Sequence, residues 1–166
     1  MTDSPLDHFQ TLAIYNTLAN RKLYEACSRL SETEYKKPRE AFFGGIMGTL
    51  NHLMVGDRIW LSRFAGEEAL SMNLDTVLYE DFTRLREARE AEDARIEAFI
   101  SSVGGGFLGD KLRYVNNQGR PLEDPVILLV AHLFNHQTHH RGQVHDMLSQ
   151  TRVEPPVLDL HRLLRP

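Results

Sequence analysis

Cysteine is almost absent from this sequence, which contains only Cys27 in 166 residues. A single cysteine excludes an internal disulfide and suits a reducing compartment. Long apolar runs are also absent: the longest is Val126–Ala131, whereas a membrane-spanning helix takes about 20 apolar residues. The first residues include Asp3 and Asp7 and lack the apolar run of a signal peptide. We therefore expect a cytoplasmic protein with no membrane partner.

The sequence has no excess of positive charge. It contains 19 Lys and Arg residues against 23 Asp and Glu residues, which gives a formal net charge of −4, and the basic residues form no stripe. Binding to nucleic acid requires a basic surface, so we expect no nucleic-acid partner. A glycine-rich phosphate loop, a cysteine in a nucleophilic context and a Ser-His-Asp signature are absent as well. These absences argue against several common enzyme classes.

The composition is otherwise that of an ordinary globular protein, with 42% hydrophobic and 25% charged residues. The length fits one domain, residues 1–166, which can bury a core without disulfides. Apolar residues recur at helical spacing in four long segments. These are residues 5–30, which open with Ser4 as N-cap, residues 45–64, residues 77–100, and a last segment that Asp124 caps and Pro125 begins.

A short stretch before the fourth helical segment has the pattern of a strand pair. Residues 111–115 alternate in polarity, residues 116–119 form a turn signal, and residues 120–123 return as a second strand. Four amphipathic helices that bury their apolar faces make a bundle. The sequence thus predicts an all-α protein, a four-helix bundle with a short β-hairpin before the last long helix.

Five of the eight histidines lie in the fourth helical segment, which is otherwise rich in apolar residues. They are His132, His136, His139, His140 and His145. Residues four apart stack on one face of a helix, so two imidazoles at this spacing can meet one metal ion. The pairs His132/His136 and His136/His140 both have this spacing, and both are candidates.

A helical wheel favours the second pair. With His132 at zero, the apolar face spans roughly 60° to 160°, His136 falls near 40° and His140 near 80°. His136 and His140 are therefore best aimed into the bundle interior. His132 and His139 fall further toward the edge of this face, where we expect them at the rim or beside the ligands.

His52 lies on the flank of the apolar face of the second helical segment, as His136 does on the fourth. Three glycines, Gly45, Gly48 and Gly56, fall within about 40° of His52. Glycines on one line indicate that another backbone approaches closely there, or that space is left for a ligand. A histidine on an apolar flank is often an ordinary core residue, so the spacing alone leaves both roles open for His52.

Two charged residues fall inside apolar faces. Arg141 points inward on the fourth segment, and a buried charge without a partner is costly. Asp57 falls near 140° on the wheel of the second segment, inside an apolar face that spans roughly 80° to 180°. We predict a buried ion pair between Asp57 and Arg141 that ties these two helices together and lies beside the histidines.

Two stretches of the chain resemble signature segments of the DinB family, part of the wider DinB/YfiT-like superfamily. They are NHLMVGDRIWLSRF, residues 51–64, and HLFNHQTHHRGQVHDML, residues 132–148, in which the string NHQTHHRGQ is the most specific. The resemblance implies a four-helix bundle in which three histidines bind a divalent metal ion, here His52, His136 and His140. It also implies a homodimer. Characterised relatives in the superfamily include isomerases and S-transferases that use low-molecular-weight thiols.

Three neutral imidazoles with one open position form the kind of metal site that enzymes use. Imidazole ligands suit several transition metals, of which we favour Zn or Ni. The expected function is a metal-dependent transferase or hydrolase that acts on a small-molecule electrophile, with a low-molecular-weight thiol as candidate cosubstrate. The alternative is a non-catalytic stress-response protein that binds a metal or small ligand, which a fourth ligand from His132 or His139 would favour.

Three further side chains have two interpretations. Met54, Trp60 and Tyr114 are of a type that lines substrate pockets. Met and aromatic residues at helical spacing nevertheless belong more often to the core, which we favour for Met54 and Trp60. The strand pattern leaves the orientation of Tyr114 open.

Overall fold

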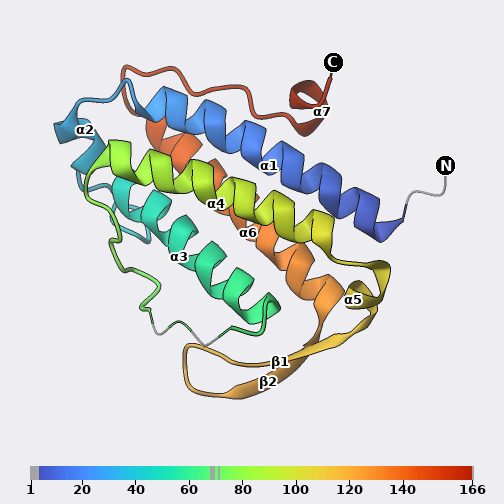
Figure 1. The fold of residues 1–166 in the computed structure, drawn as a ribbon. Coiled ribbons are helices and arrows are strands. Elements are labelled where there is room, and N and C mark those ends of the chain that lie inside the picture. The colour runs from blue at the N-terminus through green and yellow to red at the C-terminus, as the bar shows by residue number, and fades with distance from the viewer. Residues whose placement is uncertain (1–3, 68–69, 71, 166) are drawn as a thin grey trace.

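Four long helices lie side by side in the structure, a computed structural model that describes residues 4–67, 70 and 72–165 (Figure 1). They are α1 (Pro5–Cys27), α3 (Ile46–Phe64), α4 (Phe82–Ser102) and α6 (Val126–Ser149). Three short helices, α2 (Glu32–Lys36), α5 (Gly105–Gly109) and α7 (Leu160–Leu163), and two strands, β1 (Lys111–Val115) and β2 (Pro121–Pro125), complete the chain. The predicted helical bundle with a hairpin before its last long helix is confirmed.

Each long helix packs against two of the others, in the order α1, α4, α3, α6 around the bundle. Helices α1 and α6 run in one direction and α3 and α4 in the other (Figure 1). Because α3 and α4 are parallel, the connection between them has to return along the bundle. None of the helices in the described part of the chain combines the length and apolar content that crossing a membrane requires.

The observed helix ends follow from their caps. Ser4 and Asp7 form a reciprocal capping box at the start of α1, as the Ser4 signal predicts. The prediction that the third helix begins near Val77 is wrong, because α4 begins at Phe82 with Asp81 as its N-cap. The preceding residues are held in a loop, since the Asn51 side chain accepts from the Tyr79 N–H and donates to the Tyr79 carbonyl, at 2.9 and 3.0 Å.

The hairpin pairs β1 and β2 in an antiparallel register, with Leu112 opposite Asp124. Helix α6 begins one residue later than the Asp124-Pro125 signal predicts, because Pro125 takes the N-cap position. Asp124 does not cap the helix and instead accepts a hydrogen bond of 2.9 Å from the Tyr114 hydroxyl. This bond fixes the side chain of Tyr114 on one side of the hairpin.

Helix α5 is absent from the sequence prediction, which places no helix between residue 100 and the strand pair that begins at residue 111. Residues Gly105–Gly109 form one further turn, from which Leu108 is buried and Phe107 packs edge-on against Phe64 and Phe99. This turn closes the end of the bundle from which the hairpin leaves (Figure 1).

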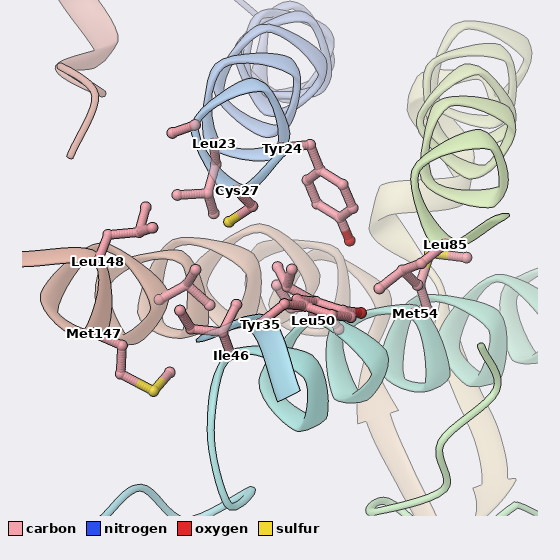
Figure 2. Packing of buried hydrophobic residues seen from close by; sticks show 13 residues of the cluster. Leu23, Tyr24, Cys27, Tyr35, Ile46, Leu50, Met54, Leu85, Met147 and Leu148 are labelled. Carbon is pink, nitrogen blue, oxygen red and sulfur yellow. The ribbon is translucent and has the colours of Figure 1, made fainter. Parts of the chain in front are cut away.

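Two separate hydrophobic clusters form the core. One contains Leu23, Leu50, Leu85 and Leu148, one residue from each long helix, and also holds the buried Cys27 (Figure 2). The second lies at the other end of the bundle and includes residues from the same four helices, among them Phe9, Leu61, Ile96 and Leu133. Each helix therefore contributes to both clusters, with a gap between them along its length.

A layer of buried polar residues fills this gap. The residues are Asn16 and Asn20 of α1, Asp57 of α3, Arg89 and Asp93 of α4, and Gln137 and Arg141 of α6, all at most 3% exposed. In every long helix these positions fall between the residues of the first cluster and those of the second. Along the bundle axis the core thus consists of one hydrophobic cluster, the polar layer and the second hydrophobic cluster.

The polar layer centres on Arg89. Its Nη1 donates to Asp57 Oδ2 at 2.6 Å, and its Nη2 lies 3.0 Å from Asp93 Oδ1. The same Asp93 oxygen accepts from the amides of Asn16 and Asn20, at 3.1 and 2.9 Å. Every charge in this contact set has an opposite charge beside it, which is what burial of ions requires.

The predicted ion pair between Asp57 and Arg141 is wrong. Both residues are buried, at 0% and 2% exposure, but the ion partner of Asp57 is Arg89. Gln137 connects the two, since its amide N–H donates to Asp57 and its carbonyl oxygen accepts from Arg141 at 3.2 Å. Arg89 escaped prediction because it lies in a highly charged run of the third segment, which resembles a solvated helix face.

Replacement of Arg89 by methionine tests the importance of this layer. Arg89→Met leaves two carboxylates buried without their counterion, so the free energy of unfolding should fall by about 3–5 kcal/mol. Urea denaturation followed by circular dichroism at pH 7 measures this change. The matched variant Arg86→Met, which removes an exposed partner of Glu90 on the same helix, should change stability by less than about 1 kcal/mol. Equal stabilities of the two variants would contradict the assignment.

Candidate metal centre

Helices α3 and α6 bring three histidines together at their interface. His52 comes from α3, and His136 and His140 come from successive turns of α6. Each offers one ligand atom, and these atoms all lie within 4.8 Å of one another. The ring centroids are 4.4 to 4.9 Å apart. The three histidines of the predicted site therefore form one cluster that could hold a metal ion.

Hydrogen bonds set the orientation of two of these rings. His52 Nδ1 lies 2.8 Å from the carbonyl oxygen of Leu74, and His140 Nδ1 lies 2.7 Å from Gln143 Oε1. A carbonyl oxygen only accepts, so each Nδ1 carries the proton and donates it. Nε2 of both rings is left with a free lone pair, which is the form in which imidazole binds a metal.

The donor set fits a divalent cation. His52 Nε2 lies 2.9 Å from His136 Nε2, and the buried Nδ1 of His136 has no hydrogen-bond partner among the described residues. If His136 carries its proton on Nδ1, two lone pairs face each other at this distance, and a shared cation would satisfy both. Nitrogen ligands about 2.0–2.1 Å from one ion are typical of zinc and related metals.

Burial keeps the cluster neutral. It lowers the pKa of His136 to about 3, with repulsion from the neighbouring imidazoles as a further cause. It also lowers the pKa of His140 to about 4, partly opposed by the hydrogen bond to Gln143. The pKa of His52 is lowered by burial as well. At neutral pH the three rings are therefore uncharged, which is the form in which imidazole binds a cation.

The glycines beside His52 have two different explanations. A Cβ on Gly48 would meet the carbonyl of Phe43, so this glycine allows the preceding loop to approach the helix closely. A Cβ on Gly56 would lie 2.8 Å from Cε1 of His136, so this glycine leaves room for an imidazole. Both interpretations of these glycines therefore apply: Gly48 allows a close approach of another backbone, and Gly56 leaves space at the site.

The loop that approaches α3 also supplies one wall of the site. The ring of Phe43 stacks on His52, with centroids 3.7 Å apart and an interplanar angle of 16°. It also meets His140 edge-on at 5.6 Å. Phe43 thus covers one side of the cluster and excludes water from it.

The cluster opens into a pocket with a volume of about 660 Å³. Its aromatic wall contains Trp60, which packs edge-on against Tyr114 at 5.4 Å and against His132 at 5.4 Å. The remaining lining residues come from α3, α6, the Phe43 loop, the connection between α3 and α4, and the hairpin: Phe42, Phe43, His52, Gly56, Ile59, Arg63, Leu74, Asn116, Asn117, Gln118, His136, His139, His140 and Gln143. Tyr114 and Trp60 line this pocket, whereas Met54 is fully buried in the core.

His132 and His139 lie at the rim of the pocket and are exposed. The ring of His132 is 5.8 Å from that of His136, and His139 Nε2 is 3.3 Å from the side-chain nitrogen of Gln143. Within the described residues, neither belongs to the group that could share one ion. Asp57 and Arg141, the other predicted neighbours of the site, lie in the polar layer behind it.

Comparison with known proteins identifies the family of the chain. A sequence model of the DinB family matches residues 1–166. The chain belongs to the DinB family. It is 26% identical over 142 residues to a Bacillus subtilis (strain 168) protein called Protein DinB, across 82% of this chain and 81% of that protein. The resemblance read from the two segments around the histidines is therefore confirmed.

Several residues of this DinB-family site escaped the sequence prediction. Gln143 stands three residues after His140, where helix geometry places side chains in contact, so the spacing contained a usable signal. Phe43 and the Leu74 carbonyl lie in loops, where no periodicity indicates what a residue faces.

Gly56 allows a test of the geometry of the cluster. Gly56→Ala pushes a methyl group against the His136 ring, so the affinity for Zn²⁺ should fall about 10–100-fold, the usual effect of disturbing a group that positions a ligand. Competition with a chromophoric chelator measures the affinity. Gly142→Ala is the matched control, since a Cβ there meets nothing within 4 Å and the affinity should not change. An unchanged affinity in Gly56→Ala would contradict the position of His136.

The lowered pKa values predict how stability depends on pH. The pKa values of these histidines in the folded protein lie below that of free imidazole, so in acid the unfolded chain binds more protons than the folded chain does. The free energy of unfolding that these neutral histidines contribute above about pH 6.5 is therefore lost as the pH falls toward 4. The loss is at most about 1.4 kcal/mol per pH unit for each histidine. Urea denaturation of metal-free wild type and His136→Asn over this range measures the difference. Parallel curves would show that His136 is protonated equally in both states.

Proposed function

We propose that this DinB-family protein is a divalent-metal-dependent transferase or hydrolase that acts on a small electrophile. The observation that carries the proposal is a cluster of three histidines beside a pocket, without a fourth protein ligand among the described residues. Three protein ligands and one position open to a small molecule are typical of catalytic rather than structural metal sites. We favour Zn or Ni as the metal, because imidazole ligands suit both.

His52, His136 and His140 would hold a divalent ion, and this ion would supply Lewis acidity that favours the deprotonated, nucleophilic form of water or of a thiol near neutral pH. A low-molecular-weight thiol is our candidate for this nucleophile, in line with the characterised relatives of the superfamily. The electrophile then accepts the sulfur or oxygen at carbon and loses its leaving group.

The protein's own residues orient the histidine ligands and bind the substrate. Leu74 and Gln143 hold His52 and His140 with Nε2 free, so the ligands need little rearrangement. Phe43 excludes water on one side of the cluster. Trp60 and Tyr114 present an aromatic surface to the apolar part of the electrophile. Positioning two reactants in one pocket is itself a large part of catalysis.

The competing function is that of a non-catalytic stress-response protein that binds a metal or small ligand. In such a protein a fourth ligand would close the coordination shell. His132 and His139 are the nearest further histidines, and among the described residues neither belongs to the group that could share one ion. This placement favours the enzyme.

Metal content and activity measured on the same samples test the proposal. Protein purified without chelator or nickel column should contain about one metal ion per chain by elemental analysis. His52→Ala and His140→Ala should lose that ion and remain folded, whereas His8→Ala, an exposed histidine of α1, should retain it. Unfolding of the ligand variants would instead argue for a structural ion.

Activity is measured as consumption of 1-chloro-2,4-dinitrobenzene with a panel of low-molecular-weight thiols. Metal-loaded wild type and His8→Ala should accelerate the reaction at least about 100-fold over His140→Ala, the scale of a lost activating group. Removal of the ion should abolish the rate, and its return should restore the rate in wild type and His8→Ala but not in His140→Ala. Bound metal without any acceleration over the thiol and electrophile panel would favour the non-catalytic function.

A further inference from the structure

Arg63 lines the same pocket as the histidines, two helical turns farther along α3 than Gly56. We propose that Arg63 binds the carboxylate of an anionic substrate or cosubstrate whose reactive atom lies at the histidine cluster. The part of this proposal that concerns the reactive atom rests on the proposed function. The carboxylate subsite stands on separate observations at Arg63.

The charge of the pocket selects for an anion. The chain as a whole has a net charge of −4 and 23 Asp and Glu residues, yet none of these carboxylates is among the described residues that line this pocket. Arg63 is the one Arg or Lys in that lining. The pocket is therefore locally positive on an acidic protein, and an anionic small molecule is the ligand that it attracts.

Arg63 is held in place without a counterion among the residues that the structure describes. Its guanidinium carbon lies 4.7 Å from the centre of the Trp60 ring and 4.8 Å from that of Tyr114. Its Nη2 donates to the Val115 carbonyl at 2.9 Å and to Asn117 Oδ1 at 3.2 Å. Two aromatic rings and two hydrogen bonds fix the plane of the group before any ligand arrives.

The remaining donors of Arg63 are available to a ligand. Nε and Nη1 make no hydrogen bond to the residues that the structure describes, and no carboxylate among those residues lies within ion-pair distance. Partial burial without an acidic partner disfavours the charged guanidinium and lowers its pKa. A carboxylate from a ligand would supply the missing counterion in a group already oriented to receive it.

The spacing defines the size of the ligand. Arg63 stands seven residues after Gly56, on the same face of α3 and roughly 10 Å farther along the helix axis. Gly56 touches the ring of His136, so it marks the level of the cluster. The helix rise between these two positions sets the order of the ligand's length, about that of three extended amino-acid residues between its carboxylate and its reactive atom.

A single arginine suits a single carboxylate better than a phosphate. The described lining contains no lysine, and phosphate sites usually combine several cationic groups or a helix N-terminus. Trp60 and Tyr114 lie beside the guanidinium and would contact the apolar or amide chain of such a ligand. The substrate class is a small organic carboxylate of extended shape.

The carboxylate subsite can be tested on metal-free protein, independently of the proposed function. Trp60 is the one tryptophan of the chain and lies against Arg63, so its fluorescence reports ligands at this position. The probes are 4-phenylbutyrate and the uncharged 4-phenylbutanol, at one ionic strength. Wild type should bind the acid about tenfold more tightly than the alcohol, as expected for one charge-assisted hydrogen bond.

Arg63→Gln should abolish this preference and leave the affinity for the alcohol unchanged. Arg113→Gln, which removes an equal charge from an exposed side chain of β1 that pairs with Glu123, should behave as wild type. Equal affinity of wild type for acid and alcohol, or a preference that survives Arg63→Gln, would overturn the proposal. If Arg63→Gln loses the alcohol as well, Arg63→Lys decides: a retained preference for the acid supports recognition by the cation, and its loss contradicts it.

The distance between the two ends is tested separately with cobalt-loaded protein and ω-mercapto carboxylates of increasing length. The thiolate-to-cobalt absorption band reports binding of sulfur to the metal. Affinity should pass through a maximum at the length that spans roughly 10 Å, and this maximum should vanish in Arg63→Gln. A wild-type affinity without such a maximum would show that Arg63 does not act together with the cluster. Absence of cobalt binding would contradict the metal site and leave the fluorescence result standing.

Discussion

The buried ion pair between Asp57 and Arg89 is the contact on which the arrangement of the bundle depends. Apolar helix faces can slide past one another with little loss, whereas a buried charge must meet its partner at one position. Asp57 and Arg89 fix the register of α3 against α4, and Gln137 and Arg141 extend the same layer to α6 and α1. We interpret the polar layer as the feature that fixes the positions of the four long helices relative to one another along the bundle axis.

The candidate metal centre uses that register. His136 immediately precedes Gln137, and His140 immediately precedes Arg141, so two ligands stand on the helical turns that the polar layer holds in place. A rotation or shift of α6 that moved the ligands would also break buried hydrogen bonds. The site can therefore keep its ligands close together without a metal ion, although three imidazoles share a small volume.

The sequence predicted what periodicity reveals and missed what loops and polar cores decide. Helical wheels, followed by the family resemblance, placed His52, His136 and His140 together because helix faces repeat every few residues. The wheels also identified Asp57 as buried but assigned it the wrong partner, since one cannot tell from charge alone which inward arginine faces which aspartate. Phe43 and Leu74 act from loops, and no local pattern indicates their contacts. The thiol, the homodimer and the cytoplasmic location stay predictions.

The position of Cys27 in the core affects how its thiol can react. The thiol is 1% exposed within the first hydrophobic cluster, and burial raises its pKa to about 12. Reaction with an electrophile requires an accessible thiolate, and this cysteine provides neither the access nor the charge. The folded protein therefore shields its single thiol from electrophiles in the surrounding solution.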